Sequence, residues 1–259
     1  MKKSVAFVET RRQQILAALA QHPGLKVRDL AVRHGVSALT IRRDLDALAA
    51  QGLLNRTYGG AALTPADASA HDNAQEDGKR ALAARAAACI HEGDTVFINS
   101  SSTALLTLEY VRECHITAIT NNGKASQQNL DPRIKLVLTG GHIQFPKEAL
   151  TGEFALRNLE KVTAEKAVMG FSGVSLDGGL TSANLDEVAI NEMMLRRTTG
   201  KVVVVVESRK LGHDSNFRSG ELAQVSHLIT DSGAGAEIVA ELTRRGIKVT
   251  LVDVAGKDG

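Results

Sequence analysis

The string GVSALTIRRDL, residues 35 to 45, places hydroxyl and guanidinium groups at the start of a predicted helix. Arg42 and Arg43 can donate paired hydrogen bonds to guanine O6 and N7 or bind phosphates, and Thr40 can do either more weakly. Ile41 and Leu45 would bury the opposite face, so the outward face presents Ser37, Ala38, Thr40, Arg42 and Arg43. These residue types at this spacing indicate recognition of double-stranded DNA in the major groove.

The same arginines could instead pair with Asp44 or Asp46 on a solvated helix. The distribution of charge favours the nucleic-acid interpretation. Residues 1–63 hold 10 Lys or Arg against 4 Asp or Glu, whereas the rest of the chain holds 21 against 25. A small basic module attached to a mildly acidic body is expected when one end of a chain binds a polyanion.

A second group of hydroxyls follows a predicted strand and opens a helix in the string NSSST, which begins at Asn99. Side-chain hydroxyls and backbone N–H groups would converge there on an anion, the hydroxyls being those of Ser100, Ser101, Ser102 and Thr103. A serine-rich turn of this kind can also be only a helix cap. Asn121 and the pair Gly140–Gly141 each follow a predicted strand as well, at the edge where open α/β sheets bind ligands.

Three short helices and a hairpin are predicted to carry the DNA-contacting residues. The first two helices cover about 9–21 and 27–34, Gly35 ends the second, and Ser37 caps a third that carries Ile41, Leu45 and Leu48. Residues 53–60 then form two extended pieces around a turn, a candidate wing in which Arg56 and Tyr58 would contact phosphates or the minor groove. Tyr58 could equally pack on the third helix. We expect a winged helix-turn-helix domain over residues 8–63.

Residues 64–78 are small and polar without an apolar period, which predicts an exposed linker. From Lys79 to Ala255, short β-branched runs alternate with helix-like stretches, the pattern of a mainly parallel sheet covered on both faces. The expected fold is therefore α/β, with strands at 95–99, 116–120, 134–139, 167–171, 202–206, 228–230 and 249–252.

Several function classes are not indicated. Cys89 and Cys114 lack ligand spacing, the histidines are scattered, and no nucleophile–base pair stands out, so we expect no metal, cofactor or catalytic site. No stretch approaches the ~18 apolar residues that span a bilayer and no signal peptide is recognisable, so we expect a cytoplasmic protein without a membrane partner.

Residues 36–45 and 48–61 together resemble the DNA-binding signature of the DeoR family, the deoxyribose-operon-type repressors of bacterial sugar metabolism. The resemblance covers about residues 9–63 and implies repression of carbohydrate-utilisation genes. Ala38 and Leu39 fill positions that are often polar in the family. Because one wing-helix module offers few base contacts, we expect a homodimer or homotetramer on operator DNA.

The resemblance continues into the second domain, where NSSST is similar to the family's phosphate-binding Asp-Ser-Gly-Thr-Thr, in a fold shared with ribose-5-phosphate isomerase. Asn99 replaces the acid and Ser101 the glycine. The string from Glu207 to Lys210 is similar to Asp-Ser-Ser-Lys, which implies that Lys210 supplies a cation to the phosphate.

Residues 181–187, TSANLDE, are similar to the family's Thr-x-x-Asn-x-x-Glu. This implies that Asn184 and Glu187 bond sugar hydroxyls, although Glu187 could only cap the helix that it begins. The family thus implies a phosphorylated sugar as effector. The chain is not expected to be an enzyme. One competing hypothesis is a sugar-phosphate isomerase, for which Asp177 would be a poorly matched general base. Another is an activator or an effector-independent architectural protein.

Overall fold

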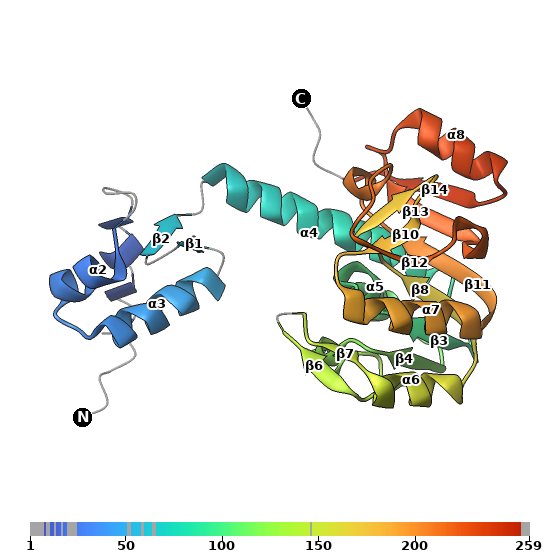
Figure 1. Cartoon of the computed structure of the whole chain (residues 1–259), viewed down its shortest axis with the longest axis horizontal. Coiled ribbons are helices and arrows are strands. Elements are labelled where there is room, and N and C mark those ends of the chain that lie inside the picture. Colours follow the sequence, from blue (N-terminus) through green and yellow to red (C-terminus); the bar gives the residue numbers. More distant parts are fainter. Residues whose placement is uncertain are drawn as a thin grey trace. The chain divides into compact units, whose positions relative to one another are not determined.

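The computed structural model describes residues 8, 11–12, 14–16, 18–19, 25–50, 53–57, 60–63, 66–145 and 147–254. The chain divides into two compact units, Met1–Gln75 and Glu76–Gly259. Figure 1 colours them in sequence order, and each is considered by itself.

The N-terminal unit is a winged helix-turn-helix, as predicted. It contains α2 (Val27–His34), α3 (Ala38–Ala50) and an antiparallel hairpin of β1 (Leu54–Thr57) and β2 (Gly60–Leu63). The described residues between 8 and 19 are also helical. One apolar cluster joins these elements, and it includes Ile15, Leu30, Ile41, Leu45, Leu48 and Leu54.

Two residues set the turn between α2 and α3. Gly35 ends α2 in the left-handed conformation, with φ of 61°, and its N–H donates to the carbonyls of the last turn. The Ser37 hydroxyl accepts a hydrogen bond from the Thr40 N–H at 3.1 Å, which caps α3. Both features were predicted, because glycine tolerates this φ and serine is a preferred cap.

The predicted polar linker, 64–78, is largely helical, because α4 extends from Ala66 to Ala87. The sequence there has no apolar period, but it is rich in alanine, the strongest helix former. The later turns of α4 bury Leu82, Ala83 and Ala86. Once packing fixes those turns, extending the helix toward its N-terminus is favourable.

The C-terminal unit is built on a seven-stranded, fully parallel sheet, which confirms the predicted α/β class. Its strand order is β14-β13-β11-β8-β3-β4-β5. The strands are β3 (Thr95–Ile98), β4 (Ile116–Thr120), β5 (Ile134–Leu138), β8 (Ala164–Met169), β11 (Thr198–Val205), β13 (His227–Asp231) and β14 (Lys248–Val252).

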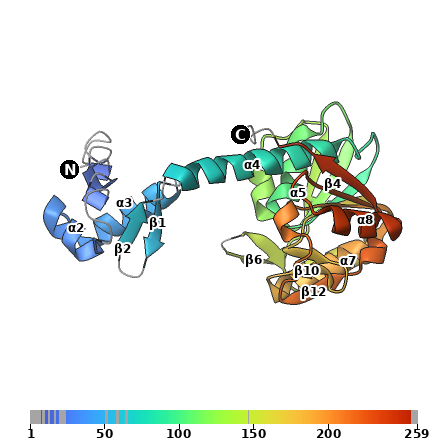
Figure 2. The ribbon, with the colours of Figure 1, turned by 90° about the horizontal axis from the view of Figure 1, so that it is seen from above.

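Helices cover both faces of this sheet, as Figures 1 and 2 show. On one face an apolar cluster joins the strands to α4 and to α5 (Ser102–Leu106). On the other face a second cluster joins them to α6 (Glu153–Glu160), α7 (Val188–Arg197) and α8 (Ala236–Arg244). The continuous apolar strand runs seen in the sequence follow from this double burial.

Two small antiparallel elements complete the unit. A three-stranded sheet has the order β12-β10-β9, with β9 (Gly173–Ser175), β10 (Gly179–Ser182) and β12 (Phe217–Gly220). A hairpin pairs β6 (His142–Gln144) with β7 (Ala149–Thr151). Short 3-10 helices at 107–110, 123–127, 185–187, 208–210 and 222–224 fill the connections.

Over the part of the chain that the structure describes, no helix is both long and apolar enough to cross a membrane. Over the same part, no group of three or more His, Cys, Asp or Glu side chains is arranged to hold a metal ion.

Candidate functional site

The outward face of α3 presents both arginines to solvent. Arg42 and Arg43 are exposed, and neither has an ion pair with a residue that the structure describes. Asp44, which could have neutralised them, is instead buried and binds the Nε atoms of Arg11 and Arg12 at 2.6 and 3.3 Å. The arginines therefore remain available to an anionic partner.

The other predicted DNA-contacting residues surround the start of α3. Ser37 is exposed and Thr40 half-buried, and their hydroxyl oxygens lie 2.9 Å apart. Ala38, half-buried, is the first residue of the helix. Arg56 lies in β1, opposite Ala61 in β2. Tyr58 lies outside the described residues, so its predicted role stays a prediction.

A cavity of about 280 Å³ lies at the carboxyl ends of four adjacent parallel strands. Residues that follow β3, β4, β8 and β11 line it, together with Lys147, Ser182 and Glu187. We call it the serine–lysine cavity, and its full lining is Ser100, Ser101, Ser102, Asn122, Lys124, Lys147, Gly170, Phe171, Ser172, Ser182, Glu187 and Lys210. The strand order reverses between β3 and β8, because β4 and β5 lie on one side and β11, β13 and β14 on the other. Open α/β sheets bind ligands at such a reversal.

Asn99 fixes the two loops that meet at this reversal. Its buried Nδ2 donates to the Gly170 carbonyl at 2.8 Å and to Asn191 Oδ1 at 3.0 Å. Its Oδ1 accepts from the N–H groups of Gly170 at 3.0 Å and Ser101 at 3.3 Å. A carboxylate could accept but not donate. The asparagine that departs from the family pattern is therefore suited to linking the β3 and β8 loops.

Ser101 does not need the conformational freedom of the glycine that it replaces. Its φ and ψ are −64° and 130°, an extended conformation open to any residue, and its hydroxyl accepts from the Ala104 N–H at 3.4 Å. The position that must lack a side chain is instead Gly170, on the loop after β8. A Cβ added there would lie 2.1 Å from Ser101 Oγ. Close approach of the two loops is thus preserved.

Three lysines converge on the serine–lysine cavity. Lys210 follows β11 and Lys124 follows β4, while Lys147 comes from the turn of the β6–β7 hairpin. Lys147 Nζ lies 3.0 Å from Glu187 Oε1, and Lys210 Nζ lies 3.1 Å from Glu207 Oε1. Lys124 has no ion pair with any described residue. Three cations against two carboxylates leave this region positive.

Glu207 anchors the lysine that follows β11. Burial would raise the pKa of its carboxyl, but hydrogen bonds and charge from Arg209 and Lys210 outweigh burial and lower the pKa to about 2. Arg209 Nε lies 2.8 Å from Glu207 Oε2, and Lys210 approaches the other oxygen. Glu207 therefore remains ionised and holds Lys210, with a side chain one carbon longer than the family's aspartate.

Glu187 does more than begin a helix. It is the N-cap residue of α7 but makes no side-chain capping hydrogen bond. Its carboxylate is buried and accepts from Lys147 Nζ at 3.0 and 3.2 Å. Glu187 therefore does not act only as a helix cap, because its carboxylate binds Lys147.

Five of the ten predicted effector residues line the cavity, namely Ser100, Ser101, Ser102, Glu187 and Lys210. The other five do not. Thr103 is buried in α5. Asn184 caps the following turn and donates to Gln144 Oε1 at 2.8 Å, so its amide serves the β6–β7 hairpin.

Asn121 and the glycine pair lie outside the cavity for local reasons. The Asn121 Nδ2 donates to the Leu150 carbonyl at 3.2 Å, while the next residue, Asn122, lines the cavity. Gly140 and Gly141 have φ of 73° and 108°, and a Cβ at Gly141 would lie 2.3 Å from the Thr151 carbonyl oxygen. These glycines form the turn into the hairpin that carries Lys147.

Sequence reasoning did not assign seven residues that line the cavity, namely Asn122, Lys124, Lys147, Ser182 and the three residues after β8, Gly170, Phe171 and Ser172. Position directly after a predicted parallel strand could have identified the β8 residues. The run predicted for that strand, 167–171, placed its end two residues beyond Met169, where β8 stops. Nothing in the local sequence marks Lys147, because its place depends on the hairpin fold.

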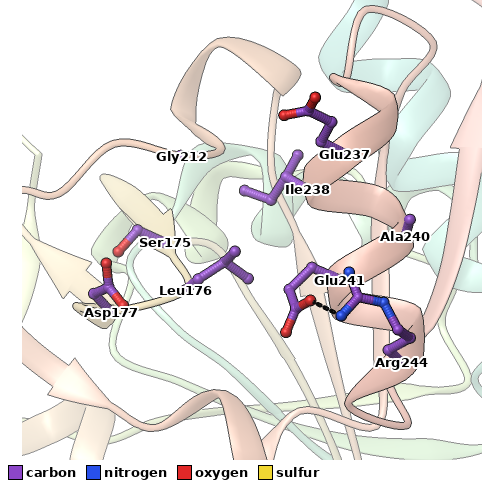
Figure 3. A pocket seen from close by; sticks show the side chains of 9 residues that line it. All are labelled: Ser175, Leu176, Asp177, Gly212, Glu237, Ile238, Ala240, Glu241 and Arg244. Atoms are coloured by element: carbon purple, nitrogen blue, oxygen red, sulfur yellow. Dashed lines mark ion pairs between the residues drawn. The ribbon is translucent and has the colours of Figure 1, made fainter.

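Asp177 lies away from the serine–lysine cavity. It lines a separate groove of about 660 Å³ beside α8, together with Leu176, Ile238 and Glu241. Figure 3 shows these side chains on the two sides of the groove, with Glu241 paired to Arg244. The residue proposed as an isomerase base is therefore not among those that line the cavity.

Comparison with solved structures finds matches of low sequence identity and low TM-score. Ribose 5-phosphate isomerase A from Methanocaldococcus jannaschii is 18% identical, with a TM-score of 0.39 over 53% of this chain and 55% of that chain. eIF2B delta from Chaetomium thermophilum is 14% identical, with a TM-score of 0.41 over 88% of this chain and 90% of that chain.

Comparison with curated proteins finds regulators of similar length. The HTH-type transcriptional regulator GlpR of Haloferax volcanii is 30% identical over 249 residues, covering 94% of this chain and 96% of that protein. The glycerol-3-phosphate regulon repressor of Escherichia coli (strain K12) is 27% identical over 250 residues, covering 94% and 99%. The HTH-type transcriptional repressor GlcR of Bacillus subtilis (strain 168) is 27% identical over 263 residues, covering 97% and 100%.

Two family profiles match consecutive parts of the chain. The DeoR-like helix-turn-helix domain matches residues 11–65, which include α2, α3 and the wing. The DeoR C terminal sensor domain matches residues 74–232, which include every residue that lines the serine–lysine cavity. The chain therefore belongs to the DeoR family of transcriptional regulators, with a DNA-binding helix-turn-helix and a C-terminal sensor domain.

Proposed function

We propose that this regulator is a repressor of carbohydrate-utilisation genes that leaves its operator when a phosphorylated sugar fills the serine–lysine cavity. The observation that carries the proposal is the convergence of Lys124, Lys147 and Lys210 beside three serines at the strand-order reversal. Ammonium groups and hydroxyls are donors suited to phosphate oxygens. The carboxylate of Glu187 would accept from a sugar hydroxyl.

Release from DNA requires that the effector bind two states of the protein with different affinity. A ligand shifts an equilibrium only by its differential affinity, and allosteric coupling between sites is typically ~1–3 kcal/mol. An effector that binds the DNA-free state more tightly would lower operator affinity by the corresponding ~5–150-fold. The proposed assembly is a homodimer or homotetramer, because paired modules supply enough base contacts for a specific operator.

The DNA half of the proposal is tested by binding to the promoter regions beside the gene. Fluorescence anisotropy at physiological salt should give sequence-preferring binding, and Arg43→Ala should weaken it at least about fivefold, since a bidentate base contact contributes ~1–3 kcal/mol. Lys161→Ala, at an exposed position after α6, is the matched control and should bind normally. Unchanged operator affinity in both Arg43→Ala and Arg42→Ala would overturn the assignment of α3.

The effector half is tested with hexose and triose phosphates and their unphosphorylated parents. A phosphorylated member should raise the melting temperature and release labelled operator, because binding to the folded state stabilises it by ~2.7 kcal/mol at a hundredfold excess over Kd. Lys210→Ala and Lys124→Ala should each lose both effects, and Lys161→Ala should keep them. Equal responses to sugars with and without phosphate would exclude a phosphate-directed site.

A further inference from the structure

The amino ends of β8, β11, β13 and β14 form a second basic region, at the edge of the sheet opposite the serine–lysine cavity. Each of these strands carries a basic residue near its start: Lys166, Lys201, His227 and Lys248. Lys201 is the register partner of Lys166, and His227 is the register partner of Lys248. The ammonium groups of Lys166 and Lys201 therefore lie on adjacent strands at the same level, and like charges this close repel each other unless something compensates them.

Strand alternation directs these side chains to one face. The apolar cluster that includes α4 contains one residue from each of three strands, Val168, Val203 and Ile229. Two residues before each of them stands a basic residue, in the same order Lys166, Lys201 and His227. Residues two apart share a face of a strand. Lys248 lies two residues before Thr250, whose hydroxyl is 2.8 Å from His227 Nε2. Arg85 and Cys89 come to the same place from the end of α4 and the turn after it.

These residues surround a cavity of about 590 Å³, which we call the basic pocket. That volume lies within the ~300–1,000 Å³ of small-molecule sites. Asp94 neutralises Lys166, with Oδ2 2.5 Å from Nζ. Arg85, Lys201 and Lys248 have no ion pair with any described residue. The one carboxylate in the lining, Glu165, accepts the Thr95 N–H at 2.8 Å.

The positive charges of the basic pocket also affect the pKa of His227. The side chain is buried, with Nδ1 3.6 Å from Cys89 Sγ and Nε2 bound to Thr250. Burial lowers the pKa of this histidine, and the charges of Lys248, Arg85 and Lys201 lower it further. The three cations that have no ion pair with a described residue thus all contribute to lowering the pKa of this one imidazole.

The start of β11 is also irregular. The register of β11 against β8 shifts between Thr198 and Lys201, and a Cβ at Gly200 would lie 2.3 Å from the Glu165 carbonyl oxygen. Bulges at the edges of sheets often redirect a side chain beside a site. Here the bulge directly precedes Lys201, whose charge faces the basic pocket.

From this geometry we propose that the basic pocket is a second anion site, which binds a small multivalent anion of the phosphate or pyrophosphate class between Arg85, Lys201 and Lys248. The site is separate from the serine–lysine cavity, since the two have no lining residue in common. The proposal does not depend on the identity of the effector.

Cys89 provides a reporter inside the basic pocket, and Cys114, which does not line it, provides an internal control. Full-length protein is alkylated with and without pyrophosphate at constant ionic strength, and each thiol is followed by peptide mass spectrometry. Pyrophosphate should slow alkylation of Cys89 at least about fivefold and leave the rate at Cys114 unchanged.

Variants separate the two anion sites. Lys201→Ala/Lys248→Ala should abolish protection of Cys89, Lys201→Arg/Lys248→Arg should retain it, and Lys210→Ala, in the serine–lysine cavity, should also retain it. The proposal is wrong if wild-type Cys89 is not protected, if the double alanine variant stays protected, or if Lys210→Ala removes the protection. The arginine variant keeps the test decisive should the alanine variant not fold.

Discussion

Two residues that depart from the family pattern, Asn99 and Glu207, have roles that follow from their contacts. Asn99 both donates to and accepts from the Gly170 peptide units, which an aspartate could not do. Glu207 pairs with both Arg209 and Lys210 through its two carboxylate oxygens. Each departure therefore preserves the geometry of the serine–lysine cavity by a different set of hydrogen bonds.

Asn99→Asp should disturb that geometry. The change removes donors to the Gly170 carbonyl and Asn191 Oδ1 and places a buried carboxylate against both oxygens. We expect a loss of stability of about 2–4 kcal/mol and a large loss of sugar-phosphate affinity, measured by urea denaturation and calorimetry. Ser102→Ala, at an exposed position, should leave stability unchanged. Wild-type stability in Asn99→Asp would show that these donors contribute little.

Glu207→Gln should reveal a pH-dependent contribution to stability. The folded pKa of about 2 lies below the unfolded value of ~4.3, so the contribution is present above about pH 4.3 and is lost as the pH falls toward about 2. We expect Gln to cost about 2 kcal/mol near neutral pH, with the difference narrowing below about pH 4 in urea denaturation. Glu153→Gln, which breaks an exposed ion pair, should show no such trend.

At the scale of elements, α3 has two faces with separate functions. Its inner face carries Asp44, which binds Arg11 and Arg12 within the N-terminal unit, and its outer face carries Arg42 and Arg43. The sequence predicted both faces, since the apolar positions recur at helical spacing. Helical spacing also puts Asp44 on the inner face, three residues after Ile41 and four before Leu48. The sequence could not show which residues pair with it, because those partners are more than thirty residues earlier.

Asp44→Ala should therefore lower the stability of the protein, whereas Arg43→Ala should lower its affinity for operator DNA. Removing one partner of a buried ion pair typically costs ~3–5 kcal/mol, so Asp44→Ala should destabilise the N-terminal unit in thermal denaturation followed by circular dichroism. Arg43→Ala should leave stability within ~0.5 kcal/mol, as expected for an exposed position, while operator affinity falls. Equal stability of the two variants would exclude a structural role for Asp44.

The β6–β7 hairpin marks the limit of prediction for elements. Its strands have three residues each, too few for a polar–apolar alternation to identify them, and the apolar Ile143 and Phe145 are exposed rather than buried. The parallel strands were easier to predict because burial on both faces produces continuous β-branched runs. Lys147 was missed because its place in the site depends on the turn between two strands that are too short to be recognised from the sequence.

For the whole molecule, the distribution of charge and the alternation of strand-like with helix-like segments predicted the division into a basic DNA-binding part and an α/β part. The carboxyl edge of the sheet was predicted as a ligand site because residues that follow parallel strands meet there. The amino edge was not predicted as a ligand site, because its lysines are far apart in the sequence and each lies near the start of a different strand without forming a motif. Convergence of this kind follows from strand order, which the sequence does not encode locally.

The contact between Ser101 and Gly170 constrains how relatives of this chain can diverge. A side chain at position 170 would overlap the Ser101 hydroxyl, and it would also lie 3.2 Å from the Val205 carbonyl oxygen. Where position 101 is glycine, the first obstacle is absent and only the second remains. Across the family, alanine at position 170 should therefore occur together with glycine at position 101, and lineages should acquire serine at 101 only while position 170 is still glycine.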